Sequence, residues 1–232
     1  MKLIKALNNS ALIVEADGSQ KVVLGKGIGF GLKPGDEIDT TKVDRIFSAG
    51  FEDKNRLIEL IKEIPDQCLE VSEEIISYAR NILKKDISDT IYISLTDHIY
   101  FILDRCQRNM LPQNPFKYDI QRFYEDEYKV GKKAVGLIED EFQVKLNDDE
   151  AAAIAMHLVN AEFEMDTYKG IEMIKLMDGI MQIIRYQLKI EFDEEKMNYQ
   201  RLITHLKFFV QRMMKTVQYE EENPLFNVVK EN

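Results

Sequence analysis

The sequence predicts a multidomain protein in which a small all-β antiparallel domain precedes two all-α helical-bundle domains, the second of them incomplete. Three observations lead to this fold class. Seven of the 11 glycines lie within residues 1–50, among short β-prone runs. From about residue 53 onward glycine is rare and apolar residues recur every three or four positions. The helical part also carries a pattern that occurs twice. The expected domains span residues 1–55, 56–170 and 171–232.

The β domain is predicted from three β-prone runs, which are Lys2–Leu7, Ala11–Ala16 and Lys21–Leu24. Asn8-Asn9 and Asp17-Gly18 separate these runs and have the composition of tight hairpin turns. A unit of roughly 50–55 residues buries little apolar surface by itself. We therefore expect this domain to pair with a partner.

The rest of the chain follows the period of an α-helix. The apolar residues between Glu70 and Leu83, for example, form one stripe along a helical face. Asn147 or Asp148 is expected to cap a helix that carries Glu150 in its first turn. The predicted helices are Glu70–Leu83, Ile91–Arg108, Phe116–Tyr128, Gly131–Glu141, Asp148–Glu164, Ile171–Leu188 and Glu194–Gln218.

The helical part repeats a pattern around two of its histidines. A phenylalanine and an arginine follow His98 by three and seven residues, and the same residue types follow His205 at the same spacings. Such self-similarity indicates two tandem modules of one kind. The counterpart of His157 in the second module falls at about position 264. The second module is therefore expected to be incomplete within these 232 residues.

The charge is unevenly distributed along the chain. The net charge is −10, which for the whole molecule argues against nucleic-acid binding, because contact with phosphates needs a basic surface. Residues 1–50 carry 7 basic and 6 acidic side chains, a net charge of +1, so the remainder has −11. The acidity therefore belongs to the helical part, and the β domain remains a candidate for binding RNA.

The sequence indicates a cytoplasmic protein. No apolar run approaches the ~18–20 residues of a membrane span, and the first residues lack the apolar core of a signal peptide. Cys68 and Cys106 are the two cysteines, and they are expected to be buried thiols in a reducing compartment and not a disulfide framework.

Histidine is rare in this chain, which has only His98, His157 and His205. Each stands in an apolar helical context, where a histidine is either a packed structural residue or a functional one. A neutral imidazole is a good nucleophile toward phosphorus near pH 7, because its ordinary pKa is about 6.5. The repeat favours phosphorylation, with Asp97 placed to orient or charge-balance His98. No metal site is predicted, because the histidines lack the short spacings typical of metal ligands.

The segment Gly25–Gly31 alternates glycine with other residues but matches neither the dinucleotide-binding nor the P-loop pattern. It is either a flexible or bulged strand pair, or a place where the backbone approaches a ligand closely. Lys26 supplies positive charge and Phe30 a stacking ring, and such groups on a small sheet suit unpaired RNA bases. Further polar donors precede this segment: Lys5, Asn8, Asn9 and Ser10.

Five segments together resemble the BglG/LicT/SacY family of transcriptional antiterminators. They are KALNNS (5–10), VVLGKGIGF (22–30), YISLTDH (92–98), AMHLVNAE (155–162) and ITHLKFF (203–209). The resemblance implies an N-terminal co-antiterminator RNA-binding domain, dimeric and β-structured, followed by two PTS-regulation domains. Family members bind a partly mismatched RNA hairpin in a nascent leader, and this hairpin excludes an overlapping terminator. Histidine phosphorylation by the sugar phosphotransferase system sets their activity.

The resemblance also implies roles for individual residues. The RNA-binding motif falls on Lys5, Asn8, Gly25, Gly27 and Phe30, with Asn9 beside it. Two positions differ, since Lys26 stands where the family usually has arginine and Ser10 where a third asparagine is common. Lysine lacks the planar fork with which arginine reads guanine edges or phosphates. His98 and His157 correspond to the paired histidines of the first regulatory domain, Asp97 to its neighbouring acid, and His205 to the first histidine of the second domain.

The expected protein is a regulator of a sugar-utilisation operon and not an enzyme, and it needs no cofactor. Its expected partners are the RNA hairpin, a second copy of the chain, and the phosphotransferase-system proteins HPr and sugar-specific enzyme II. Neither DNA binding nor membrane insertion is expected. One alternative is a helical protein-interaction module whose β domain serves dimerisation and has no RNA target. A phosphotransferase enzyme is a further alternative, but no sugar-binding signature supports it.

Overall fold

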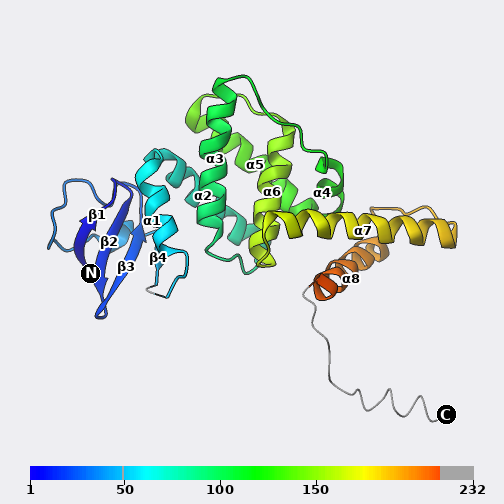
Figure 1. Cartoon of the computed structure of the whole chain (residues 1–232), viewed down its shortest axis with the longest axis horizontal. Helices are drawn as coiled ribbons and strands as arrows, with labels where there is room; N and C mark the ends of the chain where they lie inside the picture. Colours follow the sequence, from blue (N-terminus) through cyan, green and yellow to red (C-terminus); the bar gives the residue numbers. More distant parts are fainter. Residues whose placement is uncertain (49, 215–232) are drawn as a thin grey trace, which may run out of the picture. The chain divides into compact units, whose positions relative to one another are not determined.

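The computed structural model describes residues 1–48 and 50–214, and these residues confirm the predicted fold class (Figure 1). A four-stranded antiparallel sheet comes first and helices follow. The chain divides into two compact units, Met1–Thr167 and Tyr168–Asn232. The strands are β1 (Lys2–Ala6), β2 (Ala11–Ala16), β3 (Ser19–Leu24) and β4 (Arg45–Phe47). The helices are α1 (Lys54–Glu63), α2 (Asp66–Leu83), α3 (Ile91–Gln107), α4 (Lys117–Phe123), α5 (Glu125–Phe142), α6 (Asp148–Glu162), α7 (Thr167–Leu188) and α8 (Met197–Met214).

The sheet is a simple meander in which each strand pairs with the next, in the order β1-β2-β3-β4. The turn at Asp17 and Gly18 joins β2 to β3, and both residues have positive φ, as the Asp-Gly sequence predicts. The register of β1 against β2 shifts between Leu3 and Lys5, which is the signature of a bulge. Strand β4 and helix α1 are present in the structure but were not predicted, because each is short and has little periodic pattern.

The two faces of the sheet are covered differently. Successive side chains of a strand point to opposite faces, so the strands contribute to two cores. One face forms a small core of the sheet and its loops, made of Leu3, Leu12, Val14, Val23, Ile28 and Ile38. The other face contributes Ala11, Val22, Leu24 and Phe47 to the large core of the helices. The sheet therefore shares a core with the helices that follow it.

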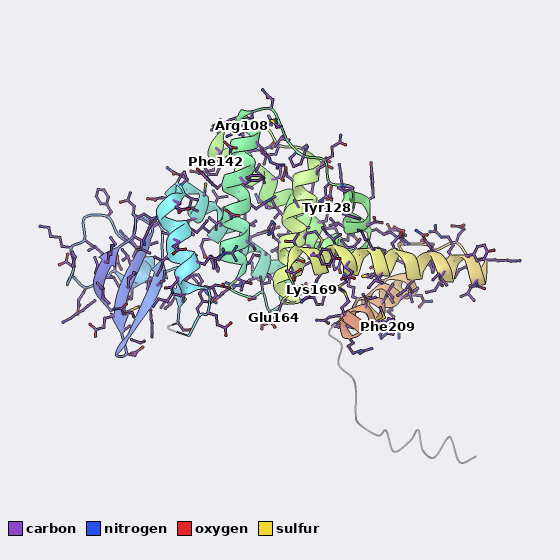
Figure 2. The ribbon with its side chains drawn as sticks, in the orientation of Figure 1. Arg108, Tyr128, Phe142, Glu164, Lys169 and Phe209 are labelled. Atoms are coloured by element: carbon purple, nitrogen blue, oxygen red, sulfur yellow. The ribbon has the colours of Figure 1, made fainter. Side chains whose placement is uncertain are left out.

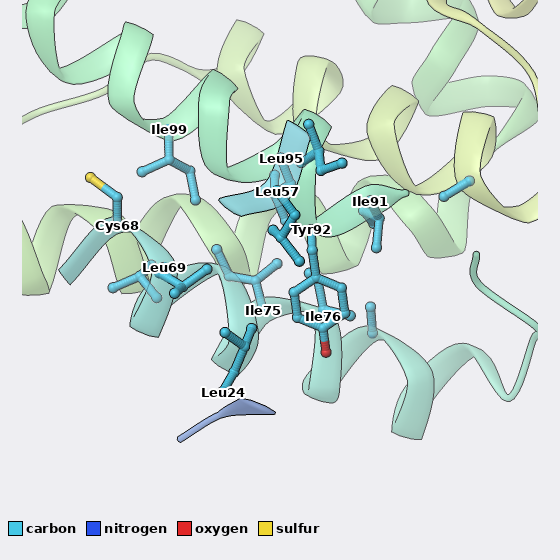
Figure 3. Close-up of a cluster of buried hydrophobic side chains, with 14 of the residues drawn as sticks. Leu24, Leu57, Cys68, Leu69, Ile75, Ile76, Ile91, Tyr92, Leu95 and Ile99 are labelled. Carbon is cyan, nitrogen blue, oxygen red and sulfur yellow. The ribbon is translucent and has the colours of Figure 1, made fainter. Parts of the chain in front are cut away.

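The shared core is centred on helices α1, α2 and α3. Figure 3 shows Leu24 of β3 beside Ile75 and Ile76 of α2, with Tyr92 of α3 close by. All four side chains are almost completely buried. Cys68 is also buried in this core, and burial raises the pKa of its thiol to about 11. Both Cys68 and Cys106 are free thiols, as predicted, but Cys106 is only partly buried, against the expectation that both are buried.

One break between helices lies at a different place than predicted. The predicted break between Tyr128 and Gly131 is absent, because α5 continues through both residues. The break lies instead at Tyr124, whose φ of −127° and ψ of 51° are not helical. The sequence misleads here because glycine is a poor helix former. Gly131 nevertheless lies inside α5. The close approach of α6 requires a glycine there, because a Cβ would lie 2.1 Å from the carbonyl oxygen of Ala151.

The second unit is built from α7, which begins at the end of the first unit, and α8. The ring of Phe192 between these helices lies 5.7 Å from the ring of Tyr199 on α8. Arg185 near the end of α7 stacks over Phe192 from 5.9 Å. Phe209 on α8, labelled in Figure 2, is half exposed. The last predicted helix extends to Gln218, so its final residues lie outside the described part of the chain. Within that part, no helix is long and apolar enough to span a bilayer.

Candidate RNA-binding and phosphorylation sites

Two loops lie together at one end of the sheet. The first connects β1 to β2 and contains Asn8, whose Oδ1 accepts a hydrogen bond from the backbone N–H of Ser10 (2.9 Å). The backbone N–H of Gly25 donates to the carbonyl oxygen of Ser10 (3.0 Å), and that of Gly29 donates to the carbonyl oxygen of Asn9 (2.8 Å). The loop after β3 is thereby fastened to the loop after β1.

The second loop depends on glycine at defined positions. A Cβ on Gly25 would lie 1.8 Å from the carbonyl oxygen of Lys42, so no other residue fits without moving the backbone. Gly27 has a φ of +62°, which side chains rarely adopt. Gly27 accepts a hydrogen bond from the backbone N–H of Phe30 (3.2 Å), which closes a tight turn. This turn leaves the Phe30 ring 81% exposed.

The structure thus brings seven of the eight predicted RNA-binding residues into these two loops. Lys5 is the eighth, and it is an exposed residue of β1 just before the first loop. Ser10 is buried, whereas the side chain of Lys26 is 78% exposed. An exposed aromatic ring and an exposed ammonium group in one loop are suited to stacking a base and contacting a phosphate.

Helices α1 and α2 cover part of this loop pair. Glu70 of α2 accepts a hydrogen bond from Oγ of Ser10 (2.5 Å) through one oxygen, and its other oxygen lies 3.2 Å from Nζ of Lys26. The backbone N–H of Asn9 donates to Oδ2 of Asp66 (3.2 Å). Nδ2 of Asn8 reaches the carbonyl oxygen of Ile61 at 3.5 Å. Carboxylates of α2 therefore pair with the polar groups of Asn9, Ser10 and Lys26 in this conformation.

A cavity of about 380 Å³ lies between the second loop and α2. Lys26 lines one side of it, and Glu70 and Glu74 line the other, with Glu141 of α5 nearby. The pKa of Lys26 is raised, mainly by its contact with Glu70. The loop pair is therefore held by acidic side chains in this conformation.

His98 and His157 form a pair between two helices. Their ring centroids are 4.6 Å apart, His98 coming from α3 and His157 from α6. Oε2 of Glu150 lies 3.3 Å from Nε2 of His98, and the Glu150 side chain is only 1% exposed. Asn147 caps α6 as predicted, with its Oδ1 accepting from the backbone N–H of Glu150 (3.2 Å). Glu150 and His157 are seven positions apart in α6, so both lie on one face of the helix.

A polar network connects the sheet to the helix that carries His98. Arg45 of β4 makes a bidentate contact with Asp89, at 2.5 and 2.7 Å. Arg80 of α2 also donates to Asp89 (2.8 Å) and approaches the hydroxyl of Tyr92 at 3.3 Å. The ring of Phe47 packs edge-on against that of Tyr92, with centroids 5.0 Å apart. The start of α3 is therefore anchored to the last strand of the sheet.

Comparison with known proteins identifies the family. The CAT RNA binding domain matches residues 1–56, and the PRD domain matches residues 73–161 and 178–232. The chain is 40% identical to the transcription antiterminator LicT of Bacillus subtilis (strain 168), over 100% of this chain and 84% of LicT. The chain belongs to the family of CAT–PRD transcriptional antiterminators.

Two further relatives agree with this assignment. The beta-glucoside operon antiterminator of Dickeya chrysanthemi is 33% identical to this antiterminator, over 100% of this chain and 83% of that protein. The crystal structure of GlcT CAT-PRDI is 29% identical and superposes with a TM-score of 0.64. The superposition covers 69% of this chain and 97% of that structure. The repeat recognised around His98 and His205 corresponds to the two PRD matches.

Asp97 and His205 are the remaining predicted site residues of this antiterminator, and both are exposed. Asp97 is exposed on α3, and the described part of the chain shows no hydrogen bond or ion pair from it to His98. The carboxylate beside His98 belongs to Glu150 instead. His205 is exposed on α8. No cluster of residues suited to a metal ion is found among the described residues. The RNA-binding and phosphorylation roles of all these residues stay predictions.

Glu70 and Glu150 are the two site residues that sequence reasoning missed. Glu150 was predicted only as a first-turn residue, although its spacing from His157 places both on one helix face. That spacing is a signal that could have identified it. Glu70 touches residues 60 and 44 positions away in the chain, and no local pattern predicts such a contact.

Acid is expected to destabilise this antiterminator through His157. Burial, and secondarily the neighbouring His98, lower the pKa of His157 to about 3, against about 6.5 in an unfolded chain. The unfolded state therefore binds the proton first as the pH falls. The stabilising contribution of the neutral ring is fully present above about pH 6.5 and is lost toward pH 3, at up to about 1.4 kcal/mol per pH unit.

Urea denaturation over this pH range tests the effect, with a His157→Gln variant for comparison. The variant has no titrating ring at this position, so its stability should fall less steeply with acid. Equal slopes for the variant and the unchanged chain would show that His157 does not cause the loss.

Proposed function

We propose that the two loops after β1 and β3 form the RNA-binding surface of this antiterminator and recognise a hairpin in a nascent leader transcript. The observation that carries this proposal is the convergence of Asn8, Ser10, Lys26 and Phe30 at one end of the sheet. Phe30 stacks on an unpaired base, and Lys26 contacts a phosphate. Bound RNA keeps the overlapping terminator from forming, so that transcription continues into a sugar-utilisation operon.

We further propose that phosphorylation of His98, His157 and His205 controls this activity. The closeness of the first two rings and their placement on two packed helices support this role, because added phosphate charge would alter that packing. The proposed donors are HPr and a sugar-specific enzyme II, acting on a homodimer in the cytoplasm. Incubation with each phosphorylated donor should label these histidines. Absence of label from both donors would remove the phosphotransferase system from the proposal.

The test of RNA recognition is direct. Fluorescence anisotropy of the full chain with a labelled antiterminator hairpin should show saturable binding that a base-paired hairpin of scrambled sequence does not reproduce. Equal affinity for both RNAs would contradict the proposal. Because residues 1–50 carry a net charge of only +1, raising the salt concentration should weaken binding with a shallow slope.

Replacement of Glu70 by glutamine is expected to tighten RNA binding. Glu70 holds Ser10 and Lys26 through its two oxygens, and RNA must displace these contacts. The variant removes the charge that pairs with Lys26 but keeps the side-chain shape. We expect the dissociation constant to fall by about three- to tenfold. This is the free energy that RNA no longer has to spend on displacing Glu70, because an exposed ion pair contributes little free energy and a hydrogen bond to a charged group contributes somewhat more.

Glu63→Gln is the matched control, since Glu63 is exposed on α1 and its replacement makes the same change in net charge. It should bind RNA like the unchanged chain. A Glu70→Gln affinity equal to that of the control would mean that α2 does not compete with RNA.

A further inference from the structure

Glu150 is a buried carboxylate without its usual helix-capping partner. It follows the capping residue Asn147 by three positions, where a glutamate commonly bonds back to the backbone N–H of the cap. Within the described part of the chain, neither of its carboxylate oxygens accepts a hydrogen bond, and both are buried. Leaving a buried carboxylate unsatisfied is costly. Nε2 of His98 lies 3.3 Å from Oε2 of Glu150.

The two ring nitrogens of His98 have different surroundings. Nε2 is buried and lies 3.3 Å from Oε2 of Glu150 without a hydrogen bond between them, although the side chain as a whole is 19% exposed. The exposed part of His98 therefore does not include Nε2. A neutral imidazole carries its proton on one nitrogen and a lone pair on the other, and a carboxylate favours the proton on the nitrogen that it faces. The lone pair is then on Nδ1.

We propose that Glu150 is a positioning residue that makes Nδ1 of His98 the atom that accepts a phosphoryl group. This inference rests on the proposed function, in which His98 is phosphorylated. The Nδ1 lone pair attacks phosphorus, the bond from phosphorus to the donor atom breaks, and its electron pair leaves with the donor. The proton on Nε2 stays in place, so the phosphorylated ring is an imidazolium cation, and the Glu150 carboxylate beside Nε2 balances its positive charge.

Phosphorylation at Nε2 is disfavoured by the same geometry. A phosphoryl group on that nitrogen would bring negative charge against a carboxylate that has almost no access to water. Repulsion between such charges is strong where solvent does not screen it. Attack from Nε2 would also require its proton to move to Nδ1, away from Glu150. Both effects act in the same direction, so one isomer should dominate.

The experiment uses potassium phosphoramidate, a small phosphoryl donor that needs no partner protein. The full chain, a Glu150→Gln variant and an Asp148→Asn variant are treated alike, and long-range proton–nitrogen NMR spectra identify the phosphorylated nitrogen of each histidine. Asp148 is the matched control, because it lies on the same helix turn but is half exposed and pairs with Lys132. The same spectra give the tautomer of the unphosphorylated His98 ring.

The expected result is Nδ1-phosphohistidine at residue 98 in the unchanged chain and in Asp148→Asn. In Glu150→Gln the ratio of the two isomers should shift toward Nε2 by about tenfold, which corresponds to about 1.4 kcal/mol. An unchanged ratio in Glu150→Gln would overturn the inference, as would an Nδ1–H tautomer in the unphosphorylated chain. The tautomer is read without any substitution, so the inference stays testable even if Glu150→Gln folds poorly.

The same experiment separates this inference from the proposed function. If His98 takes up phosphate on Nε2, the phosphorylation proposal stands and the role of Glu150 falls. If His98 takes up no phosphate in any of the three proteins, both fall together.

Discussion

Alanine in place of Gly131 is expected to lower the thermal unfolding temperature of the first unit by about 5 °C or more. A Cβ at this position would lie 2.1 Å from the carbonyl oxygen of Ala151 and 3.0 Å from its carbonyl carbon. Both atoms belong to the backbone of α6, so relief requires α5 and α6 to separate. Overpacking of this kind costs about 1–3 kcal/mol, and a loss of about 2 kcal/mol in a unit of this size lowers the midpoint by about that amount.

Gly136→Ala is the matched control for this prediction. Gly136 lies on the same helix, and a Cβ there would meet no atom within 4 Å. Alanine is a better helix former than glycine, so this variant should gain about 0.5–1 kcal/mol of stability. Circular dichroism melts of the two variants should therefore shift in opposite directions. A Gly131→Ala variant as stable as Gly136→Ala would show that the helices tolerate a wider spacing.

Alanine in place of Phe30 is expected to weaken binding to the antiterminator hairpin by about 5- to 150-fold, without changing stability. The Phe30 ring is 81% exposed, so its loss removes almost no packing in the folded protein. Stacking of one base on an aromatic side chain contributes about 1–3 kcal/mol, which corresponds to that range of affinity. Anisotropy titrations measure the affinity, and thermal melts confirm that the fold is retained.

Tyr118→Ala serves as the control for general loss of an exposed ring. Tyr118 is 79% exposed on α4, a helix far from the sheet loops in the sequence. Its replacement should leave RNA affinity unchanged. If Phe30→Ala bound the hairpin as tightly as Tyr118→Ala, the stacking role of Phe30 would be wrong.

The fold class could be predicted because its signals are local. Strong turn residues such as Asp17-Gly18 and long amphipathic stripes specify strands and helices within a few residues of sequence. The misplaced break near Gly131 has a different origin. Its glycine is required by α6, a partner that the sequence around residue 131 does not reveal.

The candidate sites were predictable to different degrees. The candidate RNA-binding residues and the histidines could be named because they stand in motifs that resemble those of a known family. Their surroundings could not be named in the same way. Glu150 meets His98 only because α3 and α6 pack together, and Glu70 meets Ser10 only because the sheet packs on α2. Such contacts depend on tertiary structure and leave no periodic pattern in the sequence.

One face of the sheet packs into the same core as the helices that follow it. The boundary between the first two domains is therefore visible in the sequence but not in the packing. Val22, Leu24 and Phe47 are completely or almost completely buried in the same core as α2 and α3. A fragment cut after residue 55 would expose these side chains to water and would need a second surface to cover them. The sheet and the first helical module should therefore melt as a single cooperative unit. A repacking of α3 and α6, which carry His98 and His157, would then act on the same core as the sheet whose loops are proposed to bind RNA.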